Sequence, residues 1–199
     1  MIRIFAGAAV AVALVVASAQ AQQKPVRVVG TIVGVDGPAI VVKPRKGNEA
    51  RVTLTDKVAV YGVVRATLAD VKPGAFIGVG AMPQADGSQK AIRVMIFAEV
   101  QRGTGEGHRP WSRPGATMTN ATVDTTVAGV DGQVLRVRYK GGEQRIVIGP
   151  DAAIMAYVVG ARSELKPGAN IAINAATPKP DGSLEASRVN VGRGDVVPD

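Results

Sequence analysis

The stretch Leu68-Ala-Asp-Val-Lys-Pro-Gly-Ala75 recurs near the other end of the chain as Ser163-Glu-Leu-Lys-Pro-Gly-Ala169, with Lys-Pro-Gly-Ala in common. Pro cannot continue a helix and Gly accepts the backbone conformation that ends one, so this tetrapeptide indicates a tight stop before a new strand. A specialised stop in the same place in both halves of a chain indicates an internal duplication.

Three further matches follow in the same order and support the duplication. They are Gly34–Gly37 with Gly129–Gly132, Asp86–Ser88 with Asp181–Ser183, and Arg93-Val94 with Arg188-Val189. A period of this length predicts two tandem domains rather than a solenoid, whose repeats run to roughly 20–50 residues.

Each half reads as a series of short strands. In the first half the expected order is strands at 26–35, 39–43 and 49–54, an extended piece at 57–64, one helical turn at 67–70, and strands at 75–82 and 91–97. Alternating or β-branched residues carry these strands, and Gly-containing turns separate them. A flat sheet of so few strands would leave its edges and an apolar face exposed, which closure into a small barrel avoids.

We therefore predict an all-β protein of two tandem small β-barrels. The position of the helical turn, between the third and fourth strands, favours the OB-like barrel, with an SH3-like barrel as its rival. The expected parts are a first domain at 24–101, a Gly/Pro-rich linker at 102–117, a second domain at 118–192 and a tail at 193–199. The Gly-containing tail is expected to fray.

Residues 1–21 have the three-part order of a secretory signal peptide. A basic start ending at Arg3 precedes the apolar run Ile4–Val16, and the small-x-small sites Ala17–Ala19 and Ala19–Ala21 follow it. The run is shorter than the roughly 20 apolar residues of a membrane-spanning helix. Cleavage is favoured over an uncleaved anchor, and it predicts a periplasmic protein with no stable membrane span.

Composition limits the partners and the chemistry. Without Arg3, 23 Lys and Arg residues exceed 16 Asp and Glu residues by seven, a balance that suits anionic partners as well as a plain solvated surface. The chain has one His and no Cys, and it lacks a Gly-x-Ser-x-Gly elbow, so we expect no enzyme. Few aromatic residues and export both disfavour nucleic acid as a partner.

The turn motifs of both halves resemble a bacterial exported domain-of-unknown-function family (DUF5666-like). The likeness covers roughly Val26–Phe97 and Thr122–Val191, and these motifs are specific for architecture rather than for chemistry. The stretch Gly105–Trp111 and the following Met118–Thr122 are also similar to small exported proteins sometimes labelled metal ABC transporter permeases. That resemblance implies, at most, a connection with metal transport.

The linker holds the candidate binding residues. Trp111, the only tryptophan, stands between Arg109-Pro110 and Ser112-Arg113-Pro114. Because Pro stiffens the backbone, the segment is either a semi-rigid strap whose Trp fills a groove or an anchor presented to a partner. Trp111, Arg109 and Arg113 are the candidate partner-binding residues.

Three residues of the same region form a candidate metal site: His108, Glu106 and Met118. Imidazole, carboxylate and thioether groups bind zinc or copper, but a firm site needs three or four ligands of fixed geometry. A surface-loop histidine is the structural alternative. The aspartates of the repeated turns, Asp36, Asp86, Asp131 and Asp181, each precede a Gly and are expected to shape those turns.

We thus expect an exported, non-catalytic binding or assembly module of the cell envelope, without a cofactor. Its partner would be an envelope protein or an anionic polymer. The alternative is a periplasmic metal-handling accessory protein, and the oligomeric state stays open.

Overall fold

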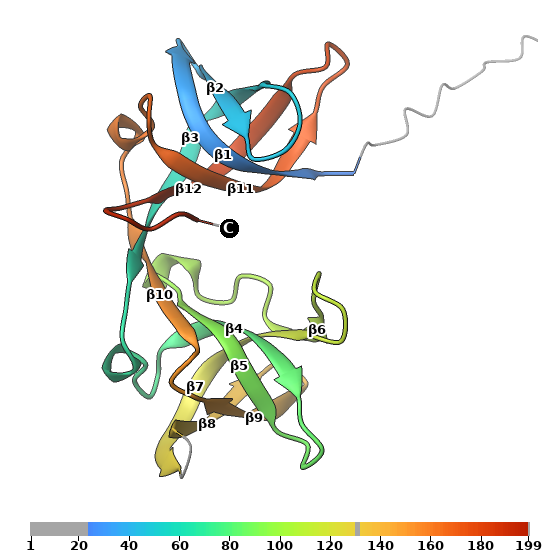
Figure 1. Cartoon of the computed structure of the whole chain (residues 1–199), viewed down its shortest axis with the longest axis vertical. Coiled ribbons are helices and arrows are strands. Elements are labelled where there is room, and N and C mark those ends of the chain that lie inside the picture. The colour runs from blue at the N-terminus through green and yellow to red at the C-terminus, as the bar shows by residue number, and fades with distance from the viewer. Residues whose placement is uncertain (1–23, 130–131, 199) are drawn as a thin grey trace, which may run out of the picture.

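The computed structural model describes residues 24–129 and 132–198, which form an all-β fold, as predicted (Figure 1). The strands are β1 (Val26–Asp36), β2 (Ala39–Pro44), β3 (Ala50–Arg65), β4 (Phe76–Pro83), β5 (Gln89–Ile96), β6 (Gly107–Pro110), β7 (Thr117–Gly129), β8 (Gly132–Tyr139), β9 (Gly142–Ile148), β10 (Ala153–Val159), β11 (Asn170–Pro178) and β12 (Leu184–Gly192). The short 3-10 helices are η1 (Leu68–Asp70), η2 (Glu99–Gln101) and η3 (Arg162–Glu164). The expected signal peptide and Asp131 lie outside the described residues.

None of the helices in these two ranges has the length and apolar character that a bilayer span requires.

The first barrel joins β1, β2 and β3 to β11 and β12. Antiparallel pairings link β3 to β2, β2 to β1, β1 to β11 and β11 to β12, and a parallel pairing of β12 with β3 closes the ring. Alternate side chains point inward and form one apolar core, which includes Ile32, Val52 and Leu165 with Ile171 and Val189.

The second barrel has the same plan, with the halves of the chain in reversed roles. Antiparallel pairings link β9 to β8, β8 to β7, β7 to β4 and β4 to β5, and a parallel pairing of β5 with β9 closes the ring. Its core includes Ile77 and Val94 from the first half with Val123, Leu135 and Ile146 from the second.

The barrels therefore do not coincide with the halves of the chain. The expected domains at 24–101 and 118–192 each contribute three strands to one barrel and two strands to the other. Within each ring the strands follow the order first, second, third, fifth, fourth, with a single helical turn before the fourth. This Greek-key order agrees with the OB-like alternative rather than the SH3-like one.

A single long strand explains why the two halves of the chain exchange their last two strands between the barrels. The pieces expected at 49–54 and 57–64 are one continuous strand, β3, whose last residues leave the first barrel and run toward the second (Figure 1). There, Tyr61–Arg65 pairs with Met155–Val159 of β10, the corresponding segment of the second half. Because β3 and β10 cross between the barrels, the next strand of each half starts in the other barrel. These next strands are β4 in the second barrel and β11 in the first.

The repeated Lys-Pro-Gly-Ala turn makes the same contact in both barrels. The Gly168 amide donates to Ile32 O (2.8 Å) and the Ile32 amide donates to Ala169 O (2.9 Å). In the second barrel the Gly74 amide donates to Val123 O (2.8 Å) and the Val123 amide donates to Ala75 O (2.8 Å). Each turn thus binds the first strand of the opposite half.

The aspartates of the Asp-Gly-Ser turns have the structural role expected of them. Asp86 Oδ1 accepts hydrogen bonds from the amide (2.9 Å) and hydroxyl (2.6 Å) of Ser88, and Asp181 Oδ1 accepts the same pair from Ser183. These bonds favour the charged carboxylate and hold the pKa of both aspartates below its ordinary value.

Residues 193–196 of the tail contact the junction between the barrels, against the expectation that the tail frays. The Arg193 amide donates to Val63 O (3.0 Å), and its guanidinium donates to both carboxylate oxygens of Glu164 (2.9 Å each). Arg65 binds Asp195, and Val196 is buried. A side chain at Gly62 would overlap the Arg193 guanidinium, so the glycine makes room for the tail.

We expect this tail contact to weaken in acid. The hydrogen bonds from Arg193 hold the pKa of the Glu164 carboxyl below its ordinary value of 4.5. A carboxyl whose pKa is lowered by folding stabilises the fold above its unfolded pKa, and this contribution is lost as pH falls through the folded pKa. Glu164→Gln should therefore lower stability by the order of 1 kcal/mol at pH 7 and have little effect near pH 3.

Thermal melting between pH 3 and pH 7 measures this effect. Arg162→Gln is a suitable control, since Arg162 makes no ion pair within the described part of the chain. An equal loss for Glu164→Gln at both ends of the pH range would contradict the explanation.

Candidate functional site

The expected linker is an ordered part of the second barrel. β6 pairs antiparallel with β7, placing His108 opposite Thr119 and Arg109 opposite Met118. The segment at 102–117 therefore extends the barrel sheet by one short strand instead of hanging between two domains.

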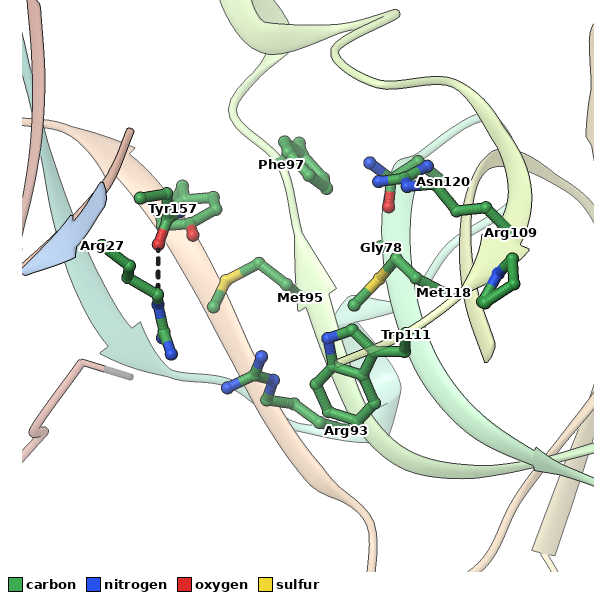
Figure 2. A pocket seen from close by; sticks show the side chains of 12 residues that line it. Arg27, Gly78, Arg93, Met95, Phe97, Arg109, Trp111, Met118, Asn120 and Tyr157 are labelled. Carbon is green, nitrogen blue, oxygen red and sulfur yellow. Dashed lines mark hydrogen bonds between the residues drawn. The ribbon is translucent and has the colours of Figure 1, made fainter. Parts of the chain in front are cut away.

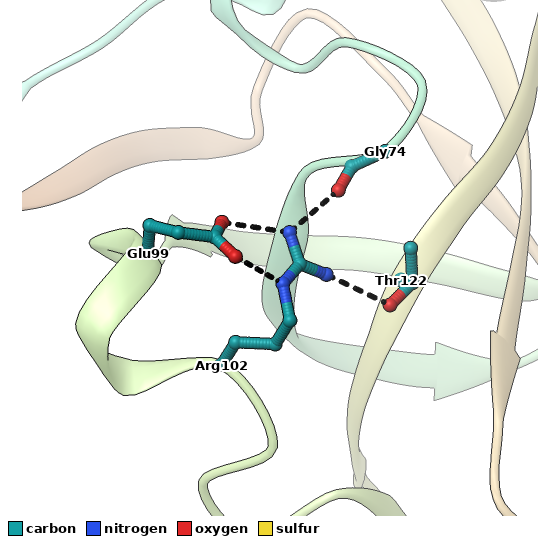
Figure 3. A network of polar contacts seen from close by, with 4 residues as sticks. All are labelled: Gly74, Glu99, Arg102 and Thr122. Atoms are coloured by element: carbon teal, nitrogen blue, oxygen red, sulfur yellow. Dashed lines mark hydrogen bonds and ion pairs between the residues drawn. The ribbon is translucent and has the colours of Figure 1, made fainter.

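A polar network holds the start of this segment (Figure 3). The Arg102 guanidinium binds the Glu99 carboxylate through two nitrogens and donates to Gly74 O (2.9 Å) and Thr122 Oγ1 (3.3 Å). Hydrogen bonding to Arg102 holds the pKa of Glu99 below its ordinary value. The network joins the segment to the Lys-Pro-Gly turn and to β7.

Trp111 packs between two neighbours and fills the space beside β4. A side chain added at Gly80 would lie 2.6 Å from Cζ3 and 2.8 Å from Cη2 of the indole ring. The Arg93 guanidinium lies over the ring, 5.3 Å from its centroid. The Trp111 amide also donates to Ala116 O (2.9 Å). This geometry fits the strap interpretation better than an anchor that is free to meet a partner.

A pocket of about 350 Å³ lies beside the strap, between the two barrels (Figure 2). The first barrel contributes Arg27 from β1 and Asn174 from β11, and Tyr157 comes from the crossing strand β10. The second barrel and the strap supply the rest of the lining: Gly78, Arg93, Met95, Phe97, Arg109, Pro110, Trp111, Met118 and Asn120. We call this site the inter-barrel pocket.

The inter-barrel pocket is positively charged. Arg27, Arg93 and Arg109 line it, and the described lining contains no Asp or Glu. Arg27 Nε donates to Asn174 Oδ1 (3.4 Å) and Arg109 Nη1 donates to Gly105 O (2.7 Å), both neutral acceptors. Neither of these two arginines makes an ion pair with a residue that the structure describes.

Several arginines elsewhere on the surface bind carboxylates. Arg51 binds Asp36, Arg136 binds Asp124, and Arg145 binds Asp86. Among the described residues Arg27 and Arg109 have no such ion-pair partner, and both line the pocket, where an anion would balance their charge.

A row of aromatic rings crosses the junction behind the pocket. Ring centroids are 5.3 Å apart for Phe76 and Phe97, 5.5 Å for Phe97 and Tyr157, and 6.1 Å for Tyr157 and Tyr61. Aromatic pairs at these distances stabilise each other beyond their buried area. The row connects the barrels and fixes the back wall of the pocket.

The candidate partner-binding residues separate into two groups. Trp111 and Arg109 line the inter-barrel pocket, whereas Arg113 lies exposed in the turn between β6 and β7 and is not part of the lining. Reasoning from the sequence missed Arg27, Asn174 and Tyr157, which are distant along the chain. Arg93 had a weak signal in the sequence, because it belongs to a repeated dipeptide.

The candidate metal ligands do not converge. His108 and Met118 lie on opposite faces of the β6–β7 pair, because their cross-strand partners are Thr119 and Arg109 respectively. His108 Nδ1 is 2.8 Å from Thr119 Oγ1, and the ring stacks on Tyr139 with centroids 6.4 Å apart.

Glu106 has a different task, since its Oε1 accepts a hydrogen bond from the Lys140 amide (3.0 Å) at the β8–β9 turn. In the part of the chain that the structure describes, no group of three or more His, Cys, Asp or Glu residues is placed to hold a metal ion.

Comparison with known proteins finds no family model, no curated protein and no solved structure that matches this chain.

Proposed function

We propose that this protein is an exported, non-catalytic binding or assembly module of the bacterial cell envelope, and that it takes an anionic partner in the inter-barrel pocket. The main support is that Arg27 and Arg109, from different barrels, line the same pocket, and that no described carboxylate lines it with them. Guanidinium groups bind carboxylates and phosphates with directed, charge-assisted hydrogen bonds.

The rest of the lining also suits binding. Asn174, Trp111 and Asn120 offer polar groups, and Met95 and Met118 offer apolar surface. A concave, largely apolar site with a few placed polar groups is the usual form of a small-molecule or side-chain pocket.

Membership in the DUF5666-like family is part of the same proposal. Its support is that the Lys-Pro-Gly-Ala and Asp-Gly-Ser motifs hold equivalent turns in both halves. The separate faces of His108 and Met118 give no support to the metal-handling alternative.

The pocket's own tryptophan allows a direct test. Trp111 is the only tryptophan of the chain, so its fluorescence reports on the inter-barrel pocket. Titration with phosphate, acetate or polygalacturonate should change the emission, whereas neutral dextran should not. The apparent affinity should fall as salt rises, because ions screen the attraction.

Charge-removing variants identify the site. Arg27→Gln and Arg109→Gln should each weaken binding about tenfold, the usual scale for loss of a charge-assisted hydrogen bond. Arg113→Gln is the matched control, since this exposed arginine lies outside the pocket. Equal effects of all three variants would assign the binding to net charge and would overturn the proposed site.

A further inference from the structure

The ring contacts in the inter-barrel pocket bear on the class of its ligand. Trp111 already has the Gly80 backbone on one side and the Arg93 guanidinium over its ring. Phe97 is in edge contact with Phe76 and Tyr157, and a side chain at Gly78 would lie 2.8 Å from its Cε2 atom. A base or sugar ring that binds by stacking needs an open aromatic face. These rings are already engaged, so stacking is disfavoured.

Two methionines supply the apolar surface that a ligand can reach. Met95 of β5 and Met118 of β7 are both half-buried. Figure 2 shows their side chains in the middle of the pocket, with Arg27, Arg93 and Arg109 around them. Thioether side chains are unbranched and flexible, so they adapt to an aliphatic chain better than to one rigid shape.

The charges lie at the margin of this apolar centre. Arg27 comes from the first barrel and Arg109 from the strap, and each has hydrogen bonds to neutral acceptors that leave other N–H groups to bind an anion. A volume of about 350 Å³ suits a compact ligand. The arrangement matches a molecule with an anionic head and a short apolar body.

We infer that the ligand of the inter-barrel pocket is an aliphatic carboxylate of medium chain length. Its carboxylate binds at the arginine margin and its chain lies on Met95 and Met118. This inference rests on the proposed function, and it narrows an anionic partner to an amphipathic one that binds without aromatic stacking.

The test compares ligands that differ in one part each. Octanoate has the head and the chain, acetate has the head alone, octanol has the chain with a neutral head, and AMP has an anion with a stacking ring. Binding to the purified full chain is followed by Trp111 fluorescence and by calorimetry. Octanoate should bind at least about tenfold more tightly than acetate or octanol, because only octanoate uses both surfaces.

Variants of the apolar centre separate the chain from the head. Met118→Gln should weaken octanoate binding several-fold and leave acetate binding unchanged. Met95→Gln should do the same and serves if the first variant folds poorly. Met82→Gln is the matched control, a half-buried methionine outside the lining.

The outcomes are distinguishable. Equal binding of acetate and octanoate, or tighter binding of AMP, would overturn the aliphatic ligand and leave the anionic function standing. Equal binding of octanol would show an apolar cleft that does not select charge. If phosphate, acetate, octanoate and polygalacturonate all fail to bind, the proposed function fails with it.

Discussion

Replacement of Gly30 by alanine is expected to be among the most destabilising single substitutions in the first barrel. Gly30 lies in β1 opposite Pro44 of β2 and beside Ile171 of β11. An added Cβ would lie 2.8 Å from both the carbonyl carbon of Lys43 and Cα of Pro44, and closer still to the Lys43 oxygen. These are backbone atoms, so no side-chain rotation relieves the overlap.

The strands would have to separate where two pairings meet. Overpacking of this kind costs about 3 kcal/mol, which corresponds to a melting temperature roughly 6–12 °C lower in a chain of this size. Thermal and urea unfolding of Gly30→Ala measure the loss.

Gly34→Ala is the matched control in the same strand. Its added Cβ would meet nothing nearer than the Val41 side chain at 3.8 Å, an ordinary contact. Because alanine orders a strand at a smaller entropic cost than glycine, this variant should be neutral or slightly more stable. Equal melting temperatures for the two variants would contradict the close approach of β1 and β2.

Local patterns were sufficient to predict most strands. The β-branched run after Lys24 became β1, and the turn Asp86–Ser88 joins β4 to β5 as expected. The helical turn after Thr67 is η1, where Asp70 accepts bonds from the Thr67 amide and hydroxyl (2.8 Å each). Such features depend on neighbours in the sequence, which a single sequence contains.

The partnership of the strands could not be predicted in the same way. The Lys-Pro-Gly-Ala turns have one sequence and make one contact, with Ile32 in one barrel and Val123 in the other. A turn that fits either first strand carries no information about which one it binds. The one cue to the exchange in the sequence was the long extended stretch that forms β3. The polar residues around Asp56 made this stretch look like two separate pieces.

The candidate site was half predictable for a related reason. Trp111 and Arg109 belong to one unusual stretch, so composition alone drew attention to them. Arg27 and Asn174 join them only because the strand exchange brings the first barrel against the strap, and nothing near either residue marks it. The pocket is therefore a consequence of the exchange, and evidence on the exchange bears on the site as well.

The second large effect expected is that an introduced disulfide will link β1 to β11 in the first barrel. Thr31 of β1 lies opposite Asn170 of β11, and its hydroxyl donates to Asn170 Oδ1 (2.9 Å). The next pair is hydrogen-bonded through the Ile32 amide and Ala169 O, so Thr31 and Asn170 form the closer, non-hydrogen-bonded type of pair. Such a pair has its Cα atoms about 4.5 Å apart, within the range that a disulfide accepts.

The sequence offers a matched alternative pair. If each half closed its own barrel, the position of Asn170 would be taken by Phe76, which follows Lys72-Pro-Gly-Ala75 as Asn170 follows Lys166-Pro-Gly-Ala169. In the exchanged structure Phe76 instead lies opposite Thr122 of β7. The natural chain has no cysteine, so any disulfide that forms within one variant chain must join the two introduced cysteines.

Disulfide formation in the double variants T31C/N170C and T31C/F76C, under mild oxidation of the folded chain, tests the exchange most directly. Non-reducing electrophoresis and the mass of the alkylated chain measure the closed fraction. The exchanged structure predicts nearly complete closure within one chain for T31C/N170C, with free thiols in T31C/F76C. Closure of T31C/F76C with free thiols in T31C/N170C would show that each half forms its own barrel, and would contradict the structure on which the pocket depends.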